Sequence, residues 1–428
     1  MSYLKRVIKN ALPDEKKHQF EKSYRFKKAQ ISNILLRNPS RGMKIIAITG
    51  TNGKTTTCTF VNEILKGTGL TTAVYTTAFT EICGIRKANK SHMTVASAWS
   101  VQSFLSNARR KSVDWVILEV TSHALDQYRI FGVPIEVAAI TNLTQDHLDY
   151  HGTMENYALA KSKLITEFNP KTVILNADDE WFSYFAKKVK NKLITVGQGR
   201  ANYQIKDIAL SPSGTSFKLV SAKSLISVNS PTIGEFNSYN IALAAAIAIS
   251  VGCDKARIEE SISRLPVVPG RMEPIDKGQS YTVLVDYAHT PDALENALVS
   301  IKSLTKGSVR LVFGATGDRD KTKRAPMGEI AAKKANFLYL TDDETYSENG
   351  DAIRRQVMEG IVKANGSEKC VEIPDRREAI KAAFIDAKPG DIVLLAGIGH
   401  QDYRAMGGKK LAWDEREVAR EILNEINP

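Results

Sequence analysis

The sequence predicts an α/β protein in which a central P-loop domain with a mostly parallel sheet precedes a Rossmann-like C-terminal α/β domain. At 428 residues the chain exceeds what one hydrophobic core usually serves, so two or three domains are expected. Apolar β-branched runs alternate with helical patterns, which indicates βαβ units. A glycine-rich turn at residues 50–53 joins one of these runs to a helix, as in a phosphate-binding loop.

A basic helical lead is expected at residues 1–42, where eleven Lys and Arg stand against three acids. Basic amphipathic helices can lie on anionic lipid, which would give peripheral contact with a membrane. Alternatively, the apolar stripe packs on the next domain and the lysines are solvated. The apolar residues form one helical face before Pro13 and another after it: Leu4, Val7, Ile8 and Ala11, then Phe20, Tyr24, Ile31, Ile34 and Leu35.

Two further domains follow the lead. We expect a central P-loop domain over residues 43–268, with strands in the apolar runs at 44–49, 115–120, 137–141 and 172–176. An Ala-rich buried helix follows them. Two prolines and a glycine predict a linker near residue 269. The C-terminal domain, 269–428, should hold a separate sheet, with strands at 282–287, 309–314, 337–341 and 391–397.

Composition narrows the function classes. No run of 18 apolar residues is present, and the first thirty residues are too charged for a signal peptide. The four cysteines are widely scattered, which favours a reducing cytoplasm. The net charge is +12, of which 11 − 3 = +8 lies in the lead. We found no zinc-finger spacing or RNP-like run, so no nucleic-acid partner is expected.

The strongest local signal is "IAITGTNGKTTTCTFVNEIL". Glycines at 50 and 53 let backbone amides approach a polyphosphate, and the helix N-terminus adds partial positive charge. Lys54 would reach the β and γ phosphates, and Thr55 would hold Mg²⁺. Ile48 stands where the strict P-loop pattern has Gly, so the match is to a shortened variant. This pattern predicts an ATP site, against the alternative of a chance glycine-rich turn.

Two further polar groups follow buried strands. Glu119 ends the run at 115–120, with Ser122 and His123 just beyond it, and His147 follows the run at 137–141. A strand-terminal carboxylate beside a P-loop is well placed for Mg²⁺. A helix cap or a salt bridge explains Glu119 equally well. Imidazole with carboxylates suits a divalent ion, although Mg²⁺ alone rarely chooses His.

Lys161 lies on an apolar helical stripe with Tyr157, Leu164, Ile165 and Phe168. It can snorkel past the stripe to water. The alternative is a partly buried lysine with a depressed pKa, which is a nucleophile. Its reaction with CO₂ would give a carbamate anion able to bind a cation. The residues alone leave both interpretations open.

Several blocks resemble the Mur ligases and occur in the family's order: "TGTNGKTTT", "EVTSHAL", "NLTQDHLDYHGTMENYALAK", "GEFNSYNIALAAA", "PGRME", "VDYAHTPDAL", "FGATGDRDKTKR" and "AGIGHQDY". The resemblance runs from about residue 43 to the end. It is strongest to the members that add an amino acid to a UDP-N-acetylmuramoyl dipeptide. It implies an ATP-dependent, ADP-forming amide ligase of peptidoglycan synthesis. In such enzymes a substrate carboxylate becomes an acyl phosphate, which an amino acid's amine attacks.

The resemblance also implies roles for particular residues. Thr55 and Glu119 would hold one Mg²⁺, and Glu119, His147 and carbamylated Lys161 a second, with Lys54 completing the catalytic set. The implied ATP site comprises Gly50, Thr51, Asn52, Gly53, Lys54, Thr55, Thr56, Asn237, Asn240, Arg271, Asp286 and Lys321. The implied site for the muramoyl peptide and the amino acid comprises Ser122, His123, Asp343, Glu344, Tyr346, Gly397 and Gln401.

Three departures from the family pattern bear on the substrates. Only 42 residues precede the P-loop strand, whereas the family's uridine-nucleotide domain needs on the order of 100. We therefore expect that domain to be lacking, and a lipid-linked muropeptide stays open. Tyr346 replaces the arginine of diaminopimelate-adding members, and Ile398 and Gln401 replace Lys and Glu. Diaminopimelate is disfavoured, and Glu344 favours a cationic acceptor such as lysine.

Two other functions remain open from the sequence. One is a P-loop ATPase or binding module without ligase activity, although His147 and Lys161 are both present. The other is an amide ligase of the same superfamily that acts on folate glutamates or a polyamino acid.

Overall fold

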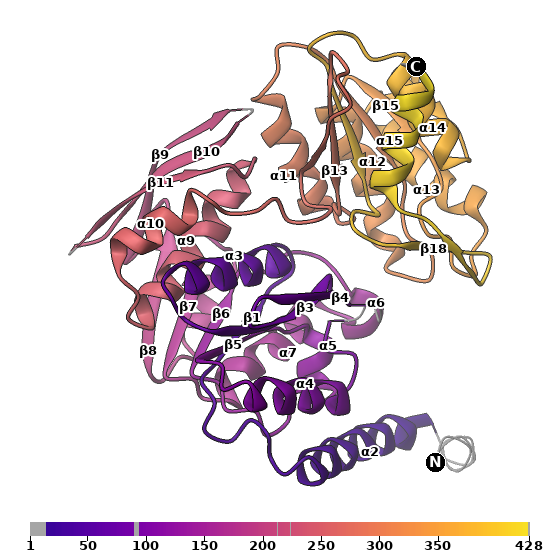
Figure 1. The fold of residues 1–428 in the computed structure, drawn as a ribbon. Helices are drawn as coiled ribbons and strands as arrows, with labels where there is room; N and C mark the ends of the chain where they lie inside the picture. The colour runs from indigo at the N-terminus through magenta and orange to yellow at the C-terminus, as the bar shows by residue number, and fades with distance from the viewer. Residues whose placement is uncertain (1–13, 90–93, 212, 223, 427–428) are drawn as a thin grey trace.

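The computed structural model describes residues 14–89, 94–211, 213–222 and 224–426. It consists of two α/β bodies, with a long N-terminal helix beside the first (Figure 1). The apolar residues expected to share the first face of the lead, from Leu4 to Ala11, lie outside the described residues.

The central sheet has eleven strands in the order β11-β10-β9-β8-β7-β6-β1-β5-β2-β3-β4. Its middle is parallel, from β9 to β2, and an antiparallel extension lies at each end. The parallel strands are β1 (Ile45–Thr49), β2 (Thr72–Tyr75), β5 (Trp115–Glu119), β6 (Val137–Ile140), β7 (Thr172–Asn176), β8 (Lys192–Gly197) and β9 (Tyr203–Ser211). The extensions are β3 (Phe79–Ile82) with β4 (Ile85–Ala88), and β10 (Gly214–Val220) with β11 (Leu225–Ser230).

Helices cover both faces of this sheet. Alternate residues of β1 point to opposite faces, so Ile46 and Ile48 belong to one hydrophobic cluster and Ile45 and Ala47 to another. The first cluster includes α3 (Lys54–Gly67), α9 (Glu235–Ser250) and α10 (Lys255–Ile262). The other face is covered by α4 (Ala98–Arg110), α5 (Ser122–Asp126) and α7 (Met154–Thr166), while α6 (Leu148–His151) and α8 (Phe182–Ala186) are short.

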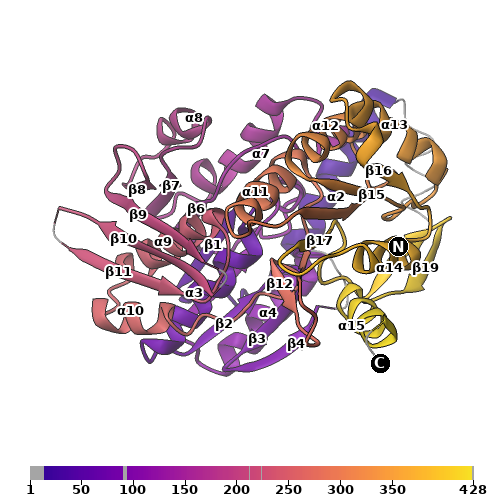
Figure 2. The same ribbon diagram turned by 90° about the horizontal axis from the view of Figure 1, so that it is seen from above.

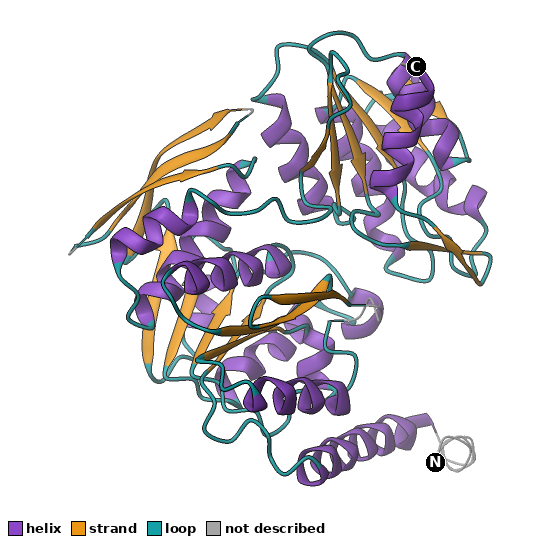
Figure 3. Ribbon diagram, viewed as in Figure 1, coloured by secondary structure: helices purple, strands orange, loops and turns teal. Residues whose placement is uncertain are grey.

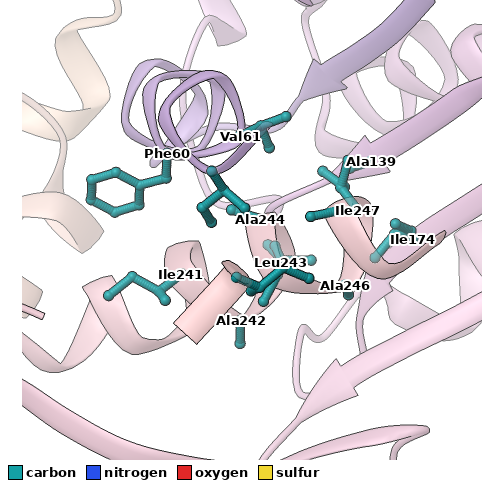
Figure 4. Packing of buried hydrophobic residues seen from close by; sticks show 14 of the residues in the cluster. Phe60, Val61, Ala139, Ile174, Ile241, Ala242, Leu243, Ala244, Ala246 and Ile247 are labelled. Atoms are coloured by element: carbon teal, nitrogen blue, oxygen red, sulfur yellow. The ribbon is translucent and has the colours of Figure 1, made fainter. Parts of the chain in front are cut away.

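The Ala-rich helix α9 packs closely on α3. Ala242, Ala244 and Ala246 are fully buried although they lie on different sides of α9, so the helix is covered on more than one side. Figure 4 shows Phe60 and Val61 of α3 beside this run of α9. The P-loop helix α3 is therefore held in place by its packing on α9, a helix of the same domain.

The C-terminal sheet has six strands in the order β12-β13-β17-β14-β15-β16 and is parallel except for β12. Its strands are β12 (Glu273–Ile275), β13 (Thr282–Asp286), β14 (Val309–Phe313), β15 (Phe337–Leu340), β16 (Cys370–Glu372) and β17 (Ile392–Ala396). One face packs on α11 (Pro291–Lys302), α12 (Arg324–Lys334) and α13 (Gly350–Lys363), and the other on α14 (Arg376–Ile385) and α15 (Glu415–Ile426). A hairpin of β18 (Tyr403–Met406) and β19 (Lys409–Ala412) lies at its edge. Figure 2 shows the two sheets side by side.

The lead forms the helix α2 (Asp14–Leu35). Of the two alternatives for its apolar stripe, packing on the next domain does not hold for Ile31, Ile34 and Leu35, which are 51%, 68% and 65% exposed. The face toward the central domain instead carries Ala29 and Ser32, whose small side chains allow close approach. Phe26 anchors it against two aromatic rings, those of Tyr128 and Phe131.

The predicted fold class is confirmed, since all eight predicted apolar runs form strands and they divide into two sheets (Figure 3). The Ala-rich helix is also present. Within the described residues, no helix is both long and apolar enough to cross a membrane.

Candidate functional site

The P-loop follows β1 and is held by the segment that follows β6. The φ of Gly53 is 78°, and its backbone is left-handed where α3 begins. A side chain there would lie 2.3 Å from Asn240 Oδ1, so only glycine fits. The backbone N–H of Asn52 donates to Asn142 Oδ1 at 2.8 Å, and its carbonyl accepts from Thr141 Oγ1 at 2.6 Å. The conformation of the loop is therefore held by hydrogen bonds from the segment after β6.

Glu119 and Thr55 meet at the carboxyl ends of neighbouring strands. Thr55 Oγ1 donates to Glu119 Oε2 at 2.9 Å, and Glu119 is 1% exposed. The backbone N–H of Thr77 donates to the same oxygen at 2.8 Å. The pairing of β1 with β5 places the P-loop beside this carboxylate, as the strand order requires. Glu119 is thus neither a helix cap nor a salt-bridge partner within the described chain.

Histidines gather beside Glu119 at the same edge of the sheet. The rings of His123 and His147 lie 4.8 Å apart, and those of His123 and His151 lie 5.5 Å apart. Ser122 Oγ lies 2.9 Å from His151 Nε2. Burial lowers the pKa of His123 to about 3 and that of both His147 and His151 to about 4. At neutral pH the three imidazoles are therefore uncharged.

Lys161 does not reach water. The residue is 1% exposed, and its ammonium donates to the carbonyl of Gly50 at 2.6 Å. The snorkelling interpretation is therefore wrong: α7 aims this side chain inward, where it ends on the P-loop. Burial lowers the pKa of Lys161 well below its usual value, and the charge of Lys54 lowers it further. At a given pH, a larger fraction of this amine is therefore neutral and nucleophilic than in an exposed lysine.

Lys54 ends close by. Its Nζ donates to the carbonyl of Thr51 at 2.7 Å, within the P-loop itself. Burial lowers its pKa, although Glu119 and Asp146 oppose the shift. Two lysines from different helices thus converge on the carbonyls of one loop, where a polyphosphate would supply much stronger acceptors.

A cavity of about 810 Å³ lies between the two α/β bodies, above the P-loop. Six residues of the implied ATP site line it: Asn52, Gly53, Thr56, Asn240, Arg271 and Asp286. A neighbouring cavity of about 700 Å³ is lined by Asn237 together with Thr56 and Arg271. The structure therefore brings P-loop residues and C-terminal residues to one space.

Lys321 does not join this group. Its ammonium lies 3.2 Å from Glu348 Oε2, and its side chain is 61% exposed. Arg271, which lines the cavity, lies over the ring of Tyr287, 4.6 Å from the ring centroid. Asp286, whose pKa is raised by burial, accepts from the backbone N–H of Met272 at 2.7 Å.

The residues implied for the amino acid cluster at the end of the C-terminal sheet. A side chain on Gly397 would lie 2.1 Å from Asp343 Oδ2, so only glycine leaves this carboxylate room. That buried oxygen has no hydrogen-bond partner in the described chain, and neither has Gln401 Oε1. The carboxylate of Glu344 accepts from the backbone N–H of Ala405 at 3.0 Å. Arg319 lies 5.0 Å from the ring of Tyr346.

The oxygen donors beside the P-loop fit a magnesium ion bound together with ATP. The described residues contain no group of three or more His, Cys, Asp and Glu side chains arranged to hold a metal. Thr55 and Glu119 nevertheless place a hydroxyl and a carboxylate side by side. Mg²⁺ typically takes one or two protein ligands and completes its shell with water and phosphate. A second ion would need an anion in place of the Lys161 ammonium.

Several contacting residues had not been predicted. Thr77 follows β2, which pairs with β5, the strand that carries Glu119. Its position just after a strand could therefore have identified it as a neighbour of Glu119. Asn142 follows β6 in the same way. Asp292 contacts Asn52 from the other domain, and no sequence pattern relates these two positions.

The comparisons with known proteins agree with this geometry. Residues 48–248 match the Mur ligase middle domain, and residues 270–399 match the Mur ligase glutamate ligase domain. The chain is 41% identical over 406 residues to UDP-N-acetylmuramoyl-L-alanyl-D-glutamate--2,6-diaminopimelate ligase of Bacillus licheniformis, which covers 93% of this chain and 82% of the relative. The same-named ligase of Syntrophomonas wolfei is 39% identical over 389 residues, 90% of this chain and 79% of the relative.

Solved structures give the same result. A structure of a ligase with that name has a TM-score of 0.65 and 32% identity, and the match covers 94% of this chain and 83% of that one. A folylpolyglutamate synthase of Mycobacterium tuberculosis has a TM-score of 0.70 at 17% identity, over 87% and 92% of the two chains, and shares the fold.

A P-loop beside a buried carboxylate, in a domain that meets a second α/β domain at a cavity, agrees with the matched families and relatives, which are ATP-dependent ligases. The chain belongs to the Mur ligase family.

Proposed function

We propose that this enzyme adds an amino acid to the carboxylate of a muramoyl peptide in peptidoglycan synthesis, with ATP converted to ADP and phosphate. The Thr55–Glu119 pair carries the proposal, because it adjoins the P-loop, whose Gly53 and Thr56 line the interdomain cavity together with Arg271 and Asp286. The relatives named above are ligases of a UDP-N-acetylmuramoyl dipeptide and diaminopimelate. A free carboxylate is a poor electrophile at neutral pH, so transfer of the γ-phosphoryl group makes the acyl carbon reactive toward an amine.

The residues divide this work between them. Lys54 and the P-loop amides from Gly50 to Thr56 hold the phosphates, as the shape of the loop allows. In the proposal Asn237, Asn240, Arg271 and Asp286 bind the nucleoside side, and Lys321 turns from Glu348 toward the phosphates on domain closure. Bound Mg²⁺ neutralises charge on the phosphoryl group in transfer. The proposed domain division remains 1–42, 43–268 and 269–428.

Lys161 is proposed to act as a carbamate. The neutral amine attacks CO₂, a C–N bond forms, the electron pair of one C=O bond moves to oxygen, and a proton leaves the nitrogen. The product carries an anion where the ammonium now donates to Gly50. With Glu119 and His147 it would complete the ligand set of a second Mg²⁺. The low pKa of Lys161 supports this step, because CO₂ reacts with the neutral amine.

The acceptor amino acid is proposed to bind at Asp343, Glu344, Tyr346, Gly397 and Gln401. Buried acceptor oxygens gather there, and two of them have no donor in the described chain. Such oxygens favour a ligand that carries ammonium groups. Tyr346 cannot supply the positive charge that would pair with a distal carboxylate. An amino acid such as lysine therefore fits better than diaminopimelate. Ser122 and His123 are proposed to contact the muramoyl peptide.

The lead is proposed to hold the enzyme at anionic lipid, where a lipid-linked muropeptide is within reach. Ile31, Ile34 and Leu35 of α2 support this, because they form an exposed apolar strip on a helix that is rich in basic residues. Vesicle sedimentation tests it. Binding to anionic but not neutral vesicles, weakened by salt and lost on deletion of residues 1–38, is the expected result. Equal recovery in the supernatant with both lipids at low salt contradicts it.

A substrate panel tests the main proposal. ADP release is measured with UDP-muramoyl dipeptide, lipid-linked muropeptide and folates, each offered with single amino acids. Turnover with either muropeptide and an amino acid is expected. Release with folates alone would assign the chain to another branch of the superfamily, and rapid ATP turnover without carboxylate and amine would indicate a simple ATPase.

A further inference from the structure

A carboxylate of the C-terminal domain is bonded directly to the P-loop. Asn52 Nδ2 donates to Asp292 Oδ2 at 2.6 Å, and Thr144 Oγ1 lies 3.4 Å from the same oxygen. Asp292 lies in the first turn of α11, two residues after the Thr290 cap, and so moves with the C-terminal domain. Asn52 belongs to the loop that holds the phosphates.

Both partners of this contact are fixed by further bonds. Asn52 is held through its backbone by Asn142 and Thr141, at 2.8 and 2.6 Å. Asp292 uses its second oxygen to accept from Asn296 Nδ2 at 3.1 Å on its own helix. A hydrogen bond to a charged carboxylate is about twice as strong as one between neutral groups. This bond therefore joins two rigid bodies rather than two mobile side chains.

The contact lies where the relative position of the domains matters. Asn52 and Asp292 both line the cavity of about 810 Å³, together with Arg271 and Asp286. The chain joins the two domains near residue 269, and Ile233 and Phe236 of the central domain pack against the hydrophobic core of the C-terminal domain. Apolar packing is not directional, so a hydrogen bond to the fixed P-loop adds a defined position across the cavity. Apart from the two bonds to Asp292, the side-chain hydrogen bond that links the domains within the described residues runs from Gln145 Nε2 to Thr322 Oγ1, a neutral pair, at 2.8 Å.

We propose that Asp292 is a positioning residue that sets the C-terminal domain on the P-loop through Asn52. It touches no reacting atom. Its carboxylate keeps Arg271 and Asp286 at the correct distance from Gly53 and Thr56. The inference rests on the proposed function only in that the cavity between the domains takes the nucleotide.

Three variants of the full chain test this role: Asp292→Ala, Asp292→Asn and, as a matched control on the same helix, Glu295→Ala. Glu295 is 46% exposed and pairs only with Lys334 among the described residues. Small-angle scattering without ligand reports the arrangement of the domains. Calorimetry with MgADP reports nucleotide affinity and requires neither a carboxylate substrate nor an amine.

Asp292→Ala should broaden the interdomain distances and weaken MgADP binding about tenfold, as for loss of one hydrogen bond to a charged group. Asp292→Asn keeps an acceptor oxygen and should recover most of both properties, while Glu295→Ala should match the wild type. Thr144→Val removes the second donor to Asp292. It should broaden the interdomain distances and weaken MgADP binding to a smaller extent than Asp292→Ala, and it replaces Asp292→Ala as the test if that variant does not fold.

Unchanged scattering and affinity in Asp292→Ala would overturn the proposal. If the wild type binds no MgADP while Asp292→Ala still broadens the scattering relative to the wild type, the domain contact stands and the proposed nucleotide site is contradicted instead.

Discussion

At the residue scale, the sequence indicated where some polar side chains lie, because strands deliver side chains to predictable places. Glu119 ends β5 and His147 follows β6, so both positions lie on the carboxyl side of the parallel sheet. The partners of these groups could not be predicted. That Lys161 ends on the carbonyl of Gly50 depends on how α7 packs, and position on a stripe does not reveal it.

The first prediction concerns Lys161. Lys161→Ala should lower kcat at least 100-fold, because it removes the proposed carbamate beside the second Mg²⁺. Acetate or formate should restore part of the activity by placing an anion in the vacated space. Lys171→Ala is the control, since that side chain is 77% exposed. Near-normal turnover of Lys161→Ala would eliminate the carbamate role.

The second prediction concerns pH. The pKa of His123 is about 3 and that of His147 and His151 about 4 in the folded state, against about 6.5 when unfolded. Below pH 6.5 the unfolded state binds more protons, so the free energy of unfolding should fall as pH decreases toward 4. Urea denaturation between pH 7.5 and 4.5 measures this, and we expect a loss of about 1 kcal/mol or more.

His123→Gln is the comparison variant for the dependence of the free energy of unfolding on pH. It removes one titrating imidazole, so its stability should depend less steeply on pH than that of the wild type. Equal slopes would mean that other groups cause the acid sensitivity.

The third prediction concerns the acceptor. Lysine should be used with a higher kcat/KM than meso-diaminopimelate, because Tyr346 cannot pair with the distal carboxylate. Tyr346→Arg should lower the ratio of kcat/KM for lysine to kcat/KM for diaminopimelate about tenfold or more. Tyr403→Phe, on the neighbouring hairpin, should leave this ratio unchanged. A wild-type preference for diaminopimelate in competition would show that another cation, such as Arg319, binds that carboxylate.

At the element scale, the buried parallel strands were predictable and the edge hairpins were not. Continuous apolar runs identify strands that are covered on both faces. Strand β4 reads Ile-Arg-Lys-Ala and is exposed along its whole length, so it carries no such pattern. The same holds for β19. The lead was predicted to be helical, but the residues that pack on the central domain could not be predicted, because small residues such as Ala29 and Ser32 are the buried ones.

The fourth prediction tests the helix pair that supports the P-loop. Ala244 is fully buried where α9 packs near α3 (Figure 4). Ala244→Leu should lower the free energy of unfolding by about 1–3 kcal/mol, because a well-packed contact has no room for three more carbons. Chemical denaturation measures the change. Ala256→Leu, at an exposed position of α10, should lie within about 0.5 kcal/mol of the wild type, and equal effects of the two substitutions would show that the α3–α9 contact is loose.

At the scale of the whole molecule, two sheets were predictable from the spacing of the strand runs, but their relative placement was not. That placement depends on contacts between distant residues, such as Asn52 with Asp292, and on a cavity that neither domain forms alone. In the proposed mechanism, the catalytic residues of one domain and the acceptor site of the other work together only when this placement is correct.

The central claim is that the enzyme activates a carboxylate by phosphorylation in the site beside Glu119. Isotope transfer tests it most directly, with UDP-muramoyl dipeptide whose reacting carboxylate is labelled with ¹⁸O, together with ATP, Mg²⁺ and lysine. An acyl phosphate leaves one carboxylate oxygen on the departing phosphate, so the account predicts that each phosphate released carries one ¹⁸O from the substrate. Phosphate released without the label, in amounts equal to the ADP formed, would contradict it.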